Sequence, residues 1–460
     1  MKPSFYNVSI QVDENEFLLI NPLSGSLDEV DKDVIELLDS WEERKDLPDS
    51  RALEHLTGRG YLTERSSDEE MALMEDMCRE IHEEYRHYKH AIIVTYDCNM
   101  NCVYCFESGA WSRGASWRKK VISKEQVTRI FDVIDELDSR FPHIPKEKVS
   151  LYGGEPFMVE NMEIIEFILE KGTEAGYGFD ANTNGLDLKE FAPLLKCYGV
   201  SPVRTTLDGP PEIHDKRRFN GKKGTFHDVI EGIEVIQDSK IEIGIRVNVD
   251  VDTIKYLPEL ARLIQEKGWF DHPRMRFALC ALVGCIGRDI AVPSLARIIK
   301  EVITLSQEYP LISRFRADWE GIVRGVAEPN LMSVIMKGVP LIPRSLYCEA
   351  HLTLMGYDPH GDIYSCPRFV GHPEQKIGTY EPLLEFTRNY ERWQKRSIFT
   401  MPDCAACSNS PLCGGGCAHT AYLKTGDITN PSCEAFNAFI EHYVPYMYKK
   451  WKMQQSTARV

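Results

Sequence analysis

The residues from 97 to 107, DCNMNCVYCFE, place three cysteines at a spacing typical of metal ligands. Cys98, Cys102 and Cys105 follow the pattern C-x3-C-x2-C. A tetrahedral zinc site uses four ligands, and a cluster of four irons ordinarily uses four cysteines. Three thiolates can hold three irons of such a cluster and leave the fourth iron open to an outside ligand. The pattern therefore predicts an iron–sulfur centre that activates a small molecule. The alternative is a zinc knuckle with a distant fourth ligand.

Further candidate residues follow other predicted strands. In YGGEP, at 152–156, Gly153 and Gly154 have no Cβ and let a ligand approach the main chain, and the carboxylate of Glu155 can pair with an ammonium group. The stretch NTNG, which contains Asn182 and Asn184, offers amide and hydroxyl groups suited to a ribose or a carboxylate. Alone, each stretch could be an ordinary turn or cap. Their positions after successive strands favour one shared binding site.

The elements that position these motifs run from about residue 90 to residue 280. Strand candidates alternate there with amphipathic helices such as SKEQVTRIFDVIDELDSRF. This alternation predicts an α/β fold with a parallel sheet, either an open doubly wound sheet or a partial (β/α)6 barrel. Ligands bind at the carboxyl ends of the strands in both architectures. The six strand candidates are AIIVTY, KVSLYG, YGFDAN, VRTTL, EIGIRVNV and RMRFAL.

The trio, with Tyr104 before its last cysteine and Phe106 after it, resembles the signature of the radical S-adenosylmethionine enzymes. YGGEP resembles the GGE motif of that family. The resemblance implies that S-adenosylmethionine chelates the open iron through its amino and carboxylate groups. It also implies that one electron cleaves this cofactor to methionine and a 5′-deoxyadenosyl radical. Gly153, Gly154 and Glu155 would then hold the methionine amino group.

The stretch TTLDGPPEIHDKRR, at 205–218, resembles the SLDG-x4-HD-x2-R stretch of the peptide-modifying branch of the family. Thr206 stands where serine is usual and keeps the hydroxyl group. Asp208 is the motif aspartate, and Arg246, within the fifth strand, could meet the cofactor carboxylate. The cofactor contacts predicted in this way are Tyr104, Phe106, Gly153, Gly154, Glu155, Asn182, Asn184, Thr206, Asp208 and Arg246.

A second group of cysteines lies near the carboxyl end, in a region rich in Cys, Gly and Pro. Such a composition is expected for a domain held together by metal rather than by a large core. The pattern C-x2-C-x5-C-x3-C followed by a further cysteine resembles the SPASM domain, which carries two auxiliary [4Fe–4S] clusters, and a zinc site is the alternative. The resemblance implies an outer cluster on Cys404, Cys407, Cys413 and Cys433 and an inner cluster on Cys348, Cys366 and Cys417.

The inner cluster would thus have three ligands. Members of the family with two complete clusters carry an eighth cysteine in the stretch that here runs from 349 to 365, and this sequence has none there. Either Cys280 or Cys285 supplies the ligand, or the iron is open to substrate. The resemblance implies three [4Fe–4S] clusters in all. We expect the scattered Cys78 and Cys197 to be buried structural thiols.

The first 65 residues read as a small separate unit of short strands and two helices. They resemble the winged-helix recognition element of peptide-maturation enzymes, which implies binding of a precursor's leader by strand addition to a sheet edge. A structural cap is the alternative. The expected domains are 1–65, recognition element; 66–89, linker helix; 90–280, partial barrel; 281–345, bridging region; 346–440, SPASM domain; and 441–460, C-terminal helix and tail.

Composition limits the partners. The formal charge of −16 argues against nucleic acid or an anionic membrane as the main partner. The sequence has no apolar run of about 18 residues and no secretory signal at its start. We therefore expect a cytoplasmic location, where fourteen cysteines would be kept reduced rather than paired in disulfides.

The resemblance as a whole implies a peptide maturase that forms a thioether crosslink in a ribosomally made precursor peptide. A small electron-donor protein such as ferredoxin or flavodoxin would reduce it. The alternatives are anaerobic sulfatase maturation to formylglycine, carbon–carbon or carbon–oxygen crosslinking, and epimerisation. A non-catalytic electron carrier is the alternative from another class.

Overall fold

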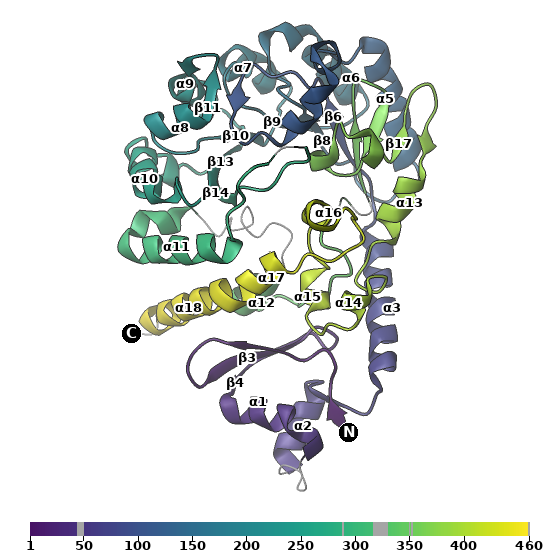
Figure 1. Ribbon diagram of the computed structural model, residues 1–460, viewed down its shortest axis with the longest axis vertical. Helices are drawn as coiled ribbons and strands as arrows, with labels where there is room; N and C mark the ends of the chain where they lie inside the picture. Colours follow the sequence, from purple (N-terminus) through teal and green to yellow (C-terminus); the bar gives the residue numbers. More distant parts are fainter. Residues whose placement is uncertain (44–49, 288, 316–329, 349, 351–352, 459–460) are drawn as a thin grey trace.

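A central sheet of mostly parallel strands organises the upper body of the molecule (Figure 1). The computed structural model describes residues 1–460 except 44–49, 288, 316–329, 349, 351–352 and 459–460. Each of the six predicted strands is present, and neighbouring strands pair in parallel in the order β14-β13-β10-β9-β8-β6. Their bounds are β6 Lys89–Ile93, β8 Val149–Tyr152, β9 Phe179–Asn182, β10 Val203–Thr206, β13 Ile243–Val249 and β14 Met275–Ala281. The predicted α/β class is confirmed.

Helices connect these strands and cover one face of the sheet. In α10 the buried Leu257, Leu260, Ala261 and Ile264 form a single stripe at helical spacing. In β13 every second residue, from Ile243 to Val249, is buried, whereas Gly244, Arg246 and Asn248 are half-buried. Polar groups thus gather on the face away from the helices. The helices are α5 Lys124–Asp138, α6 Met162–Glu174, α7 Leu188–Cys197, α8 Pro211–Arg217, α9 Phe226–Gln237 and α10 Leu257–Glu266.

The region after residue 346 does not begin as a separate fold. Strand β15, Leu354–Tyr357, pairs in parallel with β6, and Met355 lies opposite His90. Three short strands then extend the same sheet in antiparallel pairs: β16 Asp362–Tyr364, β17 Gly378–Thr379 and β18 Glu385–Phe386. The first part of the predicted SPASM region therefore continues the sheet of the predicted barrel and is held by main-chain hydrogen bonds.

Short helices complete the carboxyl-terminal region and lie below the sheet in Figure 1. A continuous helical stretch runs from α17 through a π-helical turn, Phe439–Tyr443, into α18. No helix in the described residues is long and apolar enough to cross a membrane. The remaining helices are α11 Leu295–Glu308, α12 Asn330–Lys337, α13 Arg388–Lys395, α14 Pro402–Ala405, α15 Ser410–Cys413, α16 Ala418–Thr425, α17 Glu434–Ala438 and α18 Val444–Ala458.

The first 65 residues form their own antiparallel sheet in the order β2-β3-β4, followed by two helices. Leu19, Ile35, Leu38, Leu56 and Tyr61 belong to its small core. Strand β4, with the sequence SLDEVD, was not predicted, because its charged residues lack the apolar alternation of a strand. The elements are β1 Lys2–Pro3, β2 Val8–Gln11, β3 Glu16–Asn21, β4 Ser26–Asp31, α1 Lys32–Asp39, α2 Ser50–Gly58 and β5 Leu62–Thr63.

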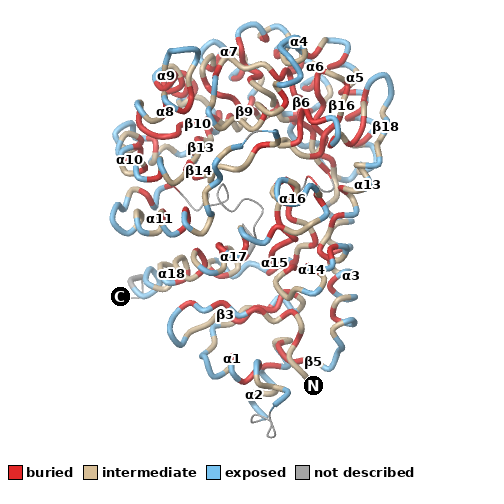
Figure 2. The backbone as a smooth tube through the Cα atoms, viewed as in Figure 1, coloured by how far each residue is buried: buried red, intermediate tan, exposed pale blue. Residues whose placement is uncertain are grey.

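The linker helix α3, Ser67–Tyr85, begins with the capping box that the sequence predicted. The Ser66 side chain accepts a hydrogen bond from the Glu69 amide, and the Glu69 carboxylate accepts one from the Ser66 amide. In Figure 1 this helix runs alongside the molecule from the N-terminal unit to the central sheet. Figure 2 shows buried residues along β6 and β10, whereas most of α2 is exposed or half-buried.

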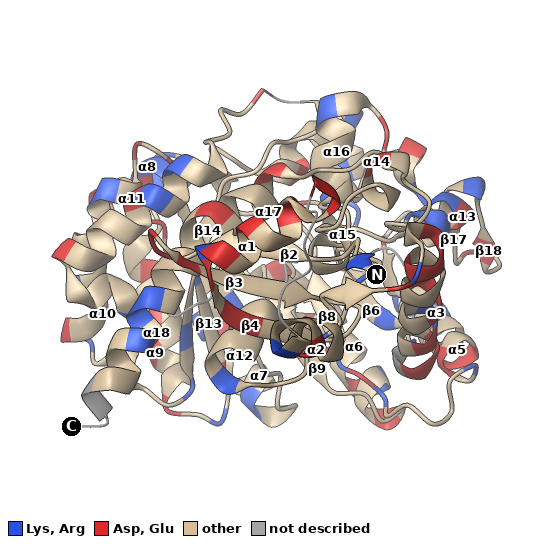
Figure 3. Ribbon diagram, turned by 90° about the horizontal axis from the view of Figure 1, so that it is seen from below, with Lys and Arg blue, Asp and Glu red and all other residues tan. Residues whose placement is uncertain are grey.

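Charge is distributed unevenly along the chain. Residues 1–85 hold 23 Asp and Glu against 8 Lys and Arg, which is −15 of the total charge of −16. Figure 3 shows acidic residues on α1, β4 and α3. Three acidic residues of the N-terminal segment, Asp13, Glu16 and Glu29, pair with the α18 lysines Lys449 and Lys452. The acidic N-terminal unit is thereby attached to the basic C-terminal helix.

Candidate functional site

The loop that carries Cys98, Cys102 and Cys105 follows β6 and is held on one side by a short strand. Strand β7, Asn101–Cys102, pairs with β11, Arg218–Asn220, and Cys102 lies opposite Arg218. The amide of Val103 also donates to the carbonyl oxygen of Arg217 at 3.0 Å. The end of the 205–218 stretch therefore holds the cysteine loop in place through main-chain hydrogen bonds.

The YGGEP turn holds the same loop on its other side. The Gly154 amide donates to the Thr95 carbonyl oxygen at 2.9 Å, and the Glu155 amide to that of Asp97 at 2.8 Å. A Cβ on Gly153 would lie 2.5 Å from the Thr95 oxygen, and one on Gly154 would lie 2.3 Å from the Asp97 oxygen. The chain's own backbone therefore requires both glycines. The sequence predicts that these glycines let a ligand approach the main chain. The close contact between the two backbone segments is by itself enough to explain why both positions are glycine.

Glu155 is buried directly behind the cysteine loop. Its carboxylate accepts hydrogen bonds from the Phe157 amide at 2.9 Å, from the Thr183 hydroxyl at 2.7 Å and from the Asn184 amide. Burial raises the pKa of Glu155 to about 7, although the three hydrogen bonds lower it. Three donors fix this carboxylate between the second and third strand ends, where its remaining lone pair can accept from a ligand.

Asn184 connects the third strand end to the first cysteine. Its side-chain amide donates to Asn99 Oδ1 at 2.8 Å and lies 3.4 Å from Cys98 Sγ, which also receives the Met100 amide at 3.4 Å. Burial raises the pKa of Cys98 to about 12. A bound metal reverses this effect, because a coordinating thiol is deprotonated. Two N–H donors directed at one sulfur suit such a thiolate.

Tyr104 and Asp208 contact each other. The Tyr104 hydroxyl donates to Asp208 and accepts from Arg218 and Asn248, each at 3.1 Å. Arg217 lies 3.4 Å from the same carboxylate, with its guanidinium 4.8 Å from the centre of the Tyr104 ring. These predicted cofactor contacts thus form a partly buried network that orients the cysteine loop. Sequence reasoning missed Asn248, although it lies two residues after Arg246 on the polar face of β13.

The other predicted contacts lie at the same end of the sheet. Phe106 begins a 3-10 helix, Phe106–Arg113, and its carbonyl oxygen accepts from the Cys285 thiol at 2.9 Å. Asn182 and Thr206 are the last residues of β9 and β10. Arg246, on β13, lies near Tyr152, and its positive charge lowers the pKa of that hydroxyl against the increase caused by burial. The sheet thus brings the strand-end residues together.

The carboxyl-terminal cysteines fall into two groups of neighbours. Burial raises the pKa of Cys366 to about 12, and the neighbouring Cys417 and Cys348 raise it further. Burial likewise raises the pKa of Cys413 to about 12. The neighbouring thiols that add to the increase at Cys413 are Cys433, Cys404 and Cys407. These are the same two sets of thiols to which the resemblance assigned one cluster each, and that assignment stays a prediction.

Two features missed in the sequence connect these groups. Arg396 is only 1% exposed and donates to the carbonyl oxygens of Ile428, Gly415 and Asn430. Thiols from both groups raise the pKa of its guanidinium against the larger decrease caused by burial. Three glycines with φ between 71° and 81° occupy the segment between Cys413 and Cys417, and a Cβ on Gly416 would lie 1.9 Å from the Ser432 oxygen. A buried cation and a tightly packed glycine turn thus join the groups.

The candidate metal ligands of the chain are its cysteine thiols. Among the described residues, no three His, Cys, Asp or Glu side chains are arranged to hold one metal ion. A cluster of four irons separates its cysteine sulfurs more widely than one ion does. None of the fourteen cysteines forms a disulfide. Cys78 is buried as expected, but Cys197 is exposed at the last residue of α7, so the prediction of a buried thiol was wrong there.

A comparison with known families identifies one domain of the chain. The family model of the radical SAM superfamily matches residues 92–264, which include the cysteine loop and five of the six parallel strands. Residues 92–264 are a radical SAM domain. The family implies a [4Fe–4S] cluster and S-adenosylmethionine, and homologous proteins are named as synthases and maturases. The chain is therefore an enzyme.

Curated relatives of the radical SAM domain differ in how much of the chain they match. The radical SAM cyclopropyl synthase TigE of Paramaledivibacter caminithermalis is 23% identical over 96% of this chain and 95% of its own. The cysteine-type anaerobic sulfatase-maturating enzyme of Clostridium novyi is 24% identical over 75% of this chain and 92% of its own. Fe-coproporphyrin III synthase of Methanosarcina barkeri is 29% identical, but over only 38% of this chain and 40% of its own.

Solved structures share the fold at low identity. The structure of anSMEcpe with bound AdoMet covers 80% of this chain and 96% of its own, with a TM-score of 0.60 and 17% identity. Streptococcus suis SuiB bound to the precursor peptide SuiA covers 94% of this chain and 99% of its own, with a TM-score of 0.50 and 14% identity. These similarities support the α/β fold of the radical SAM domain.

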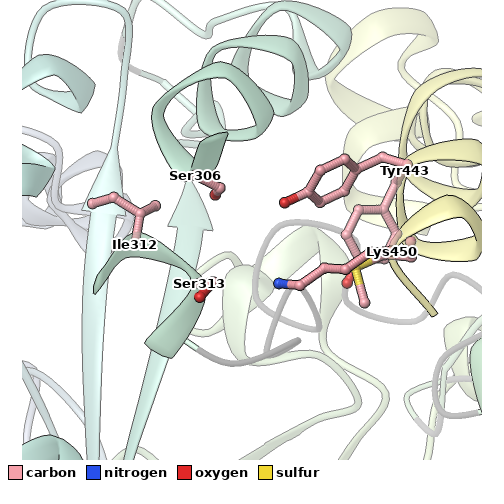
Figure 4. Close-up of a pocket in the computed structure, with 7 residues that line it drawn as sticks. Ser306, Ile312, Ser313, Tyr443 and Lys450 are labelled. Atoms are coloured by element: carbon pink, nitrogen blue, oxygen red, sulfur yellow. The ribbon is translucent and has the colours of Figure 1, made fainter. Parts of the chain in front are cut away.

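A separate cavity lies outside the radical SAM site, where the 3-10 turn Pro310–Arg314 meets the C-terminal helix (Figure 4). In Figure 4 the Tyr443 hydroxyl and the Lys450 ammonium point toward Ser306 and Ser313. Its volume of about 40 Å³ has room for a water molecule but not for S-adenosylmethionine or a peptide. The cavity is lined by Ser306, Ile312, Ser313, Tyr443, Tyr446, Met447 and Lys450.

Proposed function

We propose that this radical SAM enzyme is a peptide maturase that forms a thioether in a ribosomally made precursor peptide. Cys98, Cys102 and Cys105 hold the catalytic cluster, whose open iron takes S-adenosylmethionine. Two auxiliary clusters lie in a SPASM domain at 346–440, and residues 1–65 bind the leader of the precursor. The proposed auxiliary ligands are Cys404, Cys407, Cys413 and Cys433 for the outer cluster and Cys348, Cys366 and Cys417 for the inner one.

The observation that carries this proposal is that Tyr152 adjoins both the turn that holds the first cysteine loop and the segment around Cys366. Tyr152 immediately precedes the Gly153–Glu155 turn that holds the first cysteine loop. Its ring packs against the cluster that contains Tyr364 and Val370, on either side of Cys366. Cys366 is also close enough for its charge to raise the pKa of Tyr152. A peptide at Tyr152 would thus meet both centres.

Residues of this chain would position both S-adenosylmethionine and the peptide near Tyr152. When bound at the first trio, S-adenosylmethionine supplies the radical that removes one hydrogen atom from a peptide carbon. Closing the carbon–sulfur bond also removes the thiol proton and one electron, and an auxiliary cluster would accept that electron. The network around Tyr104 and Asp208 fixes the first cysteine loop, and Arg396 places a positive charge beside both auxiliary groups.

The relatives support a peptide substrate and leave a second candidate reaction. The match to TigE extends over 96% of this chain and therefore includes the N-terminal unit and the C-terminal cysteines. A cyclopropane is made by forming a carbon–carbon bond, which favours carbon–carbon crosslinking as the second candidate. Formylglycine formation has the weaker claim, because the sulfatase-maturating relative matches 75% of the chain.

The test is anaerobic turnover of a short Cys-containing precursor encoded next to the gene, with a chemical reductant and S-adenosylmethionine. A thioether product is lighter by two hydrogen atoms and has lost one alkylatable thiol. The same mass loss with every thiol retained would indicate a carbon–carbon crosslink. An unchanged precursor, with S-adenosylmethionine cleaved, would contradict peptide crosslinking.

A further inference from the structure

A basic surface segment follows the cysteine loop of this acidic chain. Residues 108–123, the basic segment, hold four Lys and Arg and no Asp or Glu, whereas the whole chain has a formal charge of −16. Arg113, Lys119 and Lys120 are exposed, and no ion pair joins any of them to another described residue. Unpaired cations on a surface attract an acidic partner, because opposite charges speed the encounter of two proteins.

The basic segment also exposes apolar atoms. Trp117, on the short helix α4, Ala115–Arg118, is half-buried, and the guanidinium of Arg113 lies 4.2 Å from the centre of its ring. Val121 is 38% exposed. Protein interfaces combine an apolar core with a polar rim in this way. Figure 2 shows α4 at the upper edge of the molecule and the N-terminal unit at the lower end.

Side chains of the basic segment contact the residues that lead into Cys98. Arg118 Nε lies 3.0 Å from Asp97 Oδ1, in an ion pair with the residue immediately before this cysteine. The ring of Trp117 stacks on that of Tyr96, with centres 4.4 Å apart and an angle of 20° between the planes. A partner in contact with Trp117 would therefore be separated from the start of the cysteine loop by the ring of Tyr96.

The main chain holds the basic segment against the end of β6. Thr95 and Val121 form an antiparallel bridge, and the Ile122 amide donates to the Val94 carbonyl oxygen at 2.9 Å. The Thr95 hydroxyl also donates to the carbonyl oxygen of Arg118 at 3.3 Å. The segment thus has a fixed position beside the cysteine loop. A surface formed in advance loses less conformational freedom when a partner binds.

We propose that the basic segment is the docking surface for a small acidic electron-carrier protein. The reduced carrier gives up one electron to the cluster held by Cys98, Cys102 and Cys105, and no bond forms or breaks in this step. The inference rests on the proposed function in one respect, namely that these three cysteines hold the catalytic cluster. It is independent of the peptide and of the bond formed in it.

The extent of the segment suits a carrier rather than a permanent subunit. Electron-transfer complexes are weak and bury less than about 1,200 Å² of surface, so that the carrier can leave after each transfer. A segment of this length, with one partly exposed indole ring and three unpaired cations, can supply such a contact. Nucleic acid fits less well, because the net negative charge of the chain repels it.

The test measures the binding of flavodoxin, a small acidic flavoprotein that carries single electrons. Oxidised flavodoxin with a fluorescent label is titrated with the anaerobically reconstituted enzyme, and anisotropy gives the dissociation constant. We expect the wild-type enzyme to bind flavodoxin, and the affinity to fall about fivefold between about 50 and about 200 mM NaCl, because salt screens exposed charges.

Variants then assign the binding to residues. Lys119→Glu together with Lys120→Glu should weaken flavodoxin binding about tenfold at the lower salt concentration, whereas the two Lys→Arg changes at these positions should preserve it. Lys240→Glu together with Lys300→Glu is the matched control, because these lysines are exposed, lie outside the segment and give the same change in net charge. Iron analysis checks that each variant holds its clusters.

A kinetic ratio connects the surface to electron delivery. The rate of S-adenosylmethionine cleavage with subsaturating reduced flavodoxin, divided by the rate with a chemical reductant, should fall about tenfold in the Lys119 and Lys120 double Glu variant, in step with the affinity. The same ratio in the control variant should match that of the wild-type enzyme.

Three results would overturn the assignment. They are a wild-type enzyme that does not bind flavodoxin, a control variant that loses as much affinity as the Lys119 and Lys120 variant, and loss of affinity for the precursor peptide in place of flavodoxin, which would assign the segment to the substrate. Crosslinking with a chemical reductant but without flavodoxin binding would contradict this surface alone. Flavodoxin binding through Lys119 and Lys120 without crosslinking would contradict the proposed reaction and support the surface.

Discussion

The main-chain amide of Glu155 donates a 2.8 Å hydrogen bond to the carbonyl oxygen of Asp97, the residue immediately before Cys98. The turn after the second strand of the sheet and the cysteine loop after the first are therefore one structural unit. A change in the turn must displace the cysteines. The two glycines of YGGEP consequently support cluster binding through the backbone, whether or not they contact a cofactor.

Gly154→Ala should prevent assembly of the catalytic cluster, because its Cβ would lie 2.3 Å from the Asp97 oxygen. We expect the reconstituted variant to hold about four irons fewer than the wild-type enzyme and to lose cleavage of S-adenosylmethionine. Iron analysis and chromatography of 5′-deoxyadenosine measure both. Gly178→Ala, whose Cβ would make only an ordinary 3.5 Å contact with Lys148, is the control. Full iron content in Gly154→Ala would contradict the structural role.

Replacing Cys98, Cys102 and Cys105 together with Ala should abolish formation of 5′-deoxyadenosine. Wild-type enzyme reconstituted without oxygen should contain about twelve irons and twelve sulfides, and the triple variant about eight of each. The auxiliary ligands lie in another part of the chain, so their clusters should persist. Saturation of the wild-type enzyme near four irons, with stoichiometric zinc, would rule out three clusters.

Deleting residues 1–65 should weaken precursor binding at least tenfold while cleavage of S-adenosylmethionine without peptide continues. The reason is that this unit lies apart from the cysteine loop and has a small core of its own, although Val8, Ile10 and Ile20 of its sheet also pack into the main core. Fluorescence anisotropy of a labelled precursor gives the affinity. With the intact enzyme, binding to this acidic unit should also weaken as salt is added, because salt screens exposed charges. Equal affinity for the precursor after the deletion would indicate that residues 1–65 are only a structural cap.

Replacing both Cys280 and Cys285 with Ala should leave the auxiliary-cluster spectrum unchanged in the absence of peptide. Cys285 donates to the Phe106 carbonyl oxygen, beside the loop after the first trio. We expect a Cys-containing peptide, but not its Ser analogue, to alter the auxiliary spectrum by ligating the open iron of the inner cluster. If the double mutation changes the auxiliary-cluster spectrum and the peptide thiol does not, then Cys280 or Cys285, and not the substrate, is the fourth ligand of the inner cluster.

Asp358→Asn should change how stability depends on pH. Burial raises the pKa of Asp358 to about 7, so the folded state binds a proton that the unfolded state, with a pKa near the ordinary 3.8, releases between these values. Stability therefore falls as pH rises through this interval in the wild-type enzyme. The thermal midpoint of the variant, relative to wild type, should rise by several degrees from pH 5 to pH 8. The exposed Asp132→Asn should show no such change.

The features that could be predicted from the sequence are those that depend on residues close to one another along the chain. The six parallel strands are short apolar runs between helices, and the capping box at Ser66 needs only four residues. The grouping of cysteines came from their spacing and a family resemblance. Pairing of β15 with β6 was missed because residues more than 250 positions apart carry no local signal of contact. The buried Arg396 also depends on such distant packing.

The parallel pairing of β15 with β6 restricts the distance between two of the predicted cluster ligands. Cys366 lies nine residues after the end of β15, and Cys98 lies five residues after the end of β6. Because adjacent strands of one sheet cannot slide without breaking their ladder of hydrogen bonds, the two segments that carry these cysteines begin at a fixed separation. With clusters at both cysteines, as proposed above, this fixed starting distance would limit the size of the ring that can be closed in a peptide. Precursors with a different number of residues between the joined positions would have to adopt a more compact or more extended conformation to reach both sites.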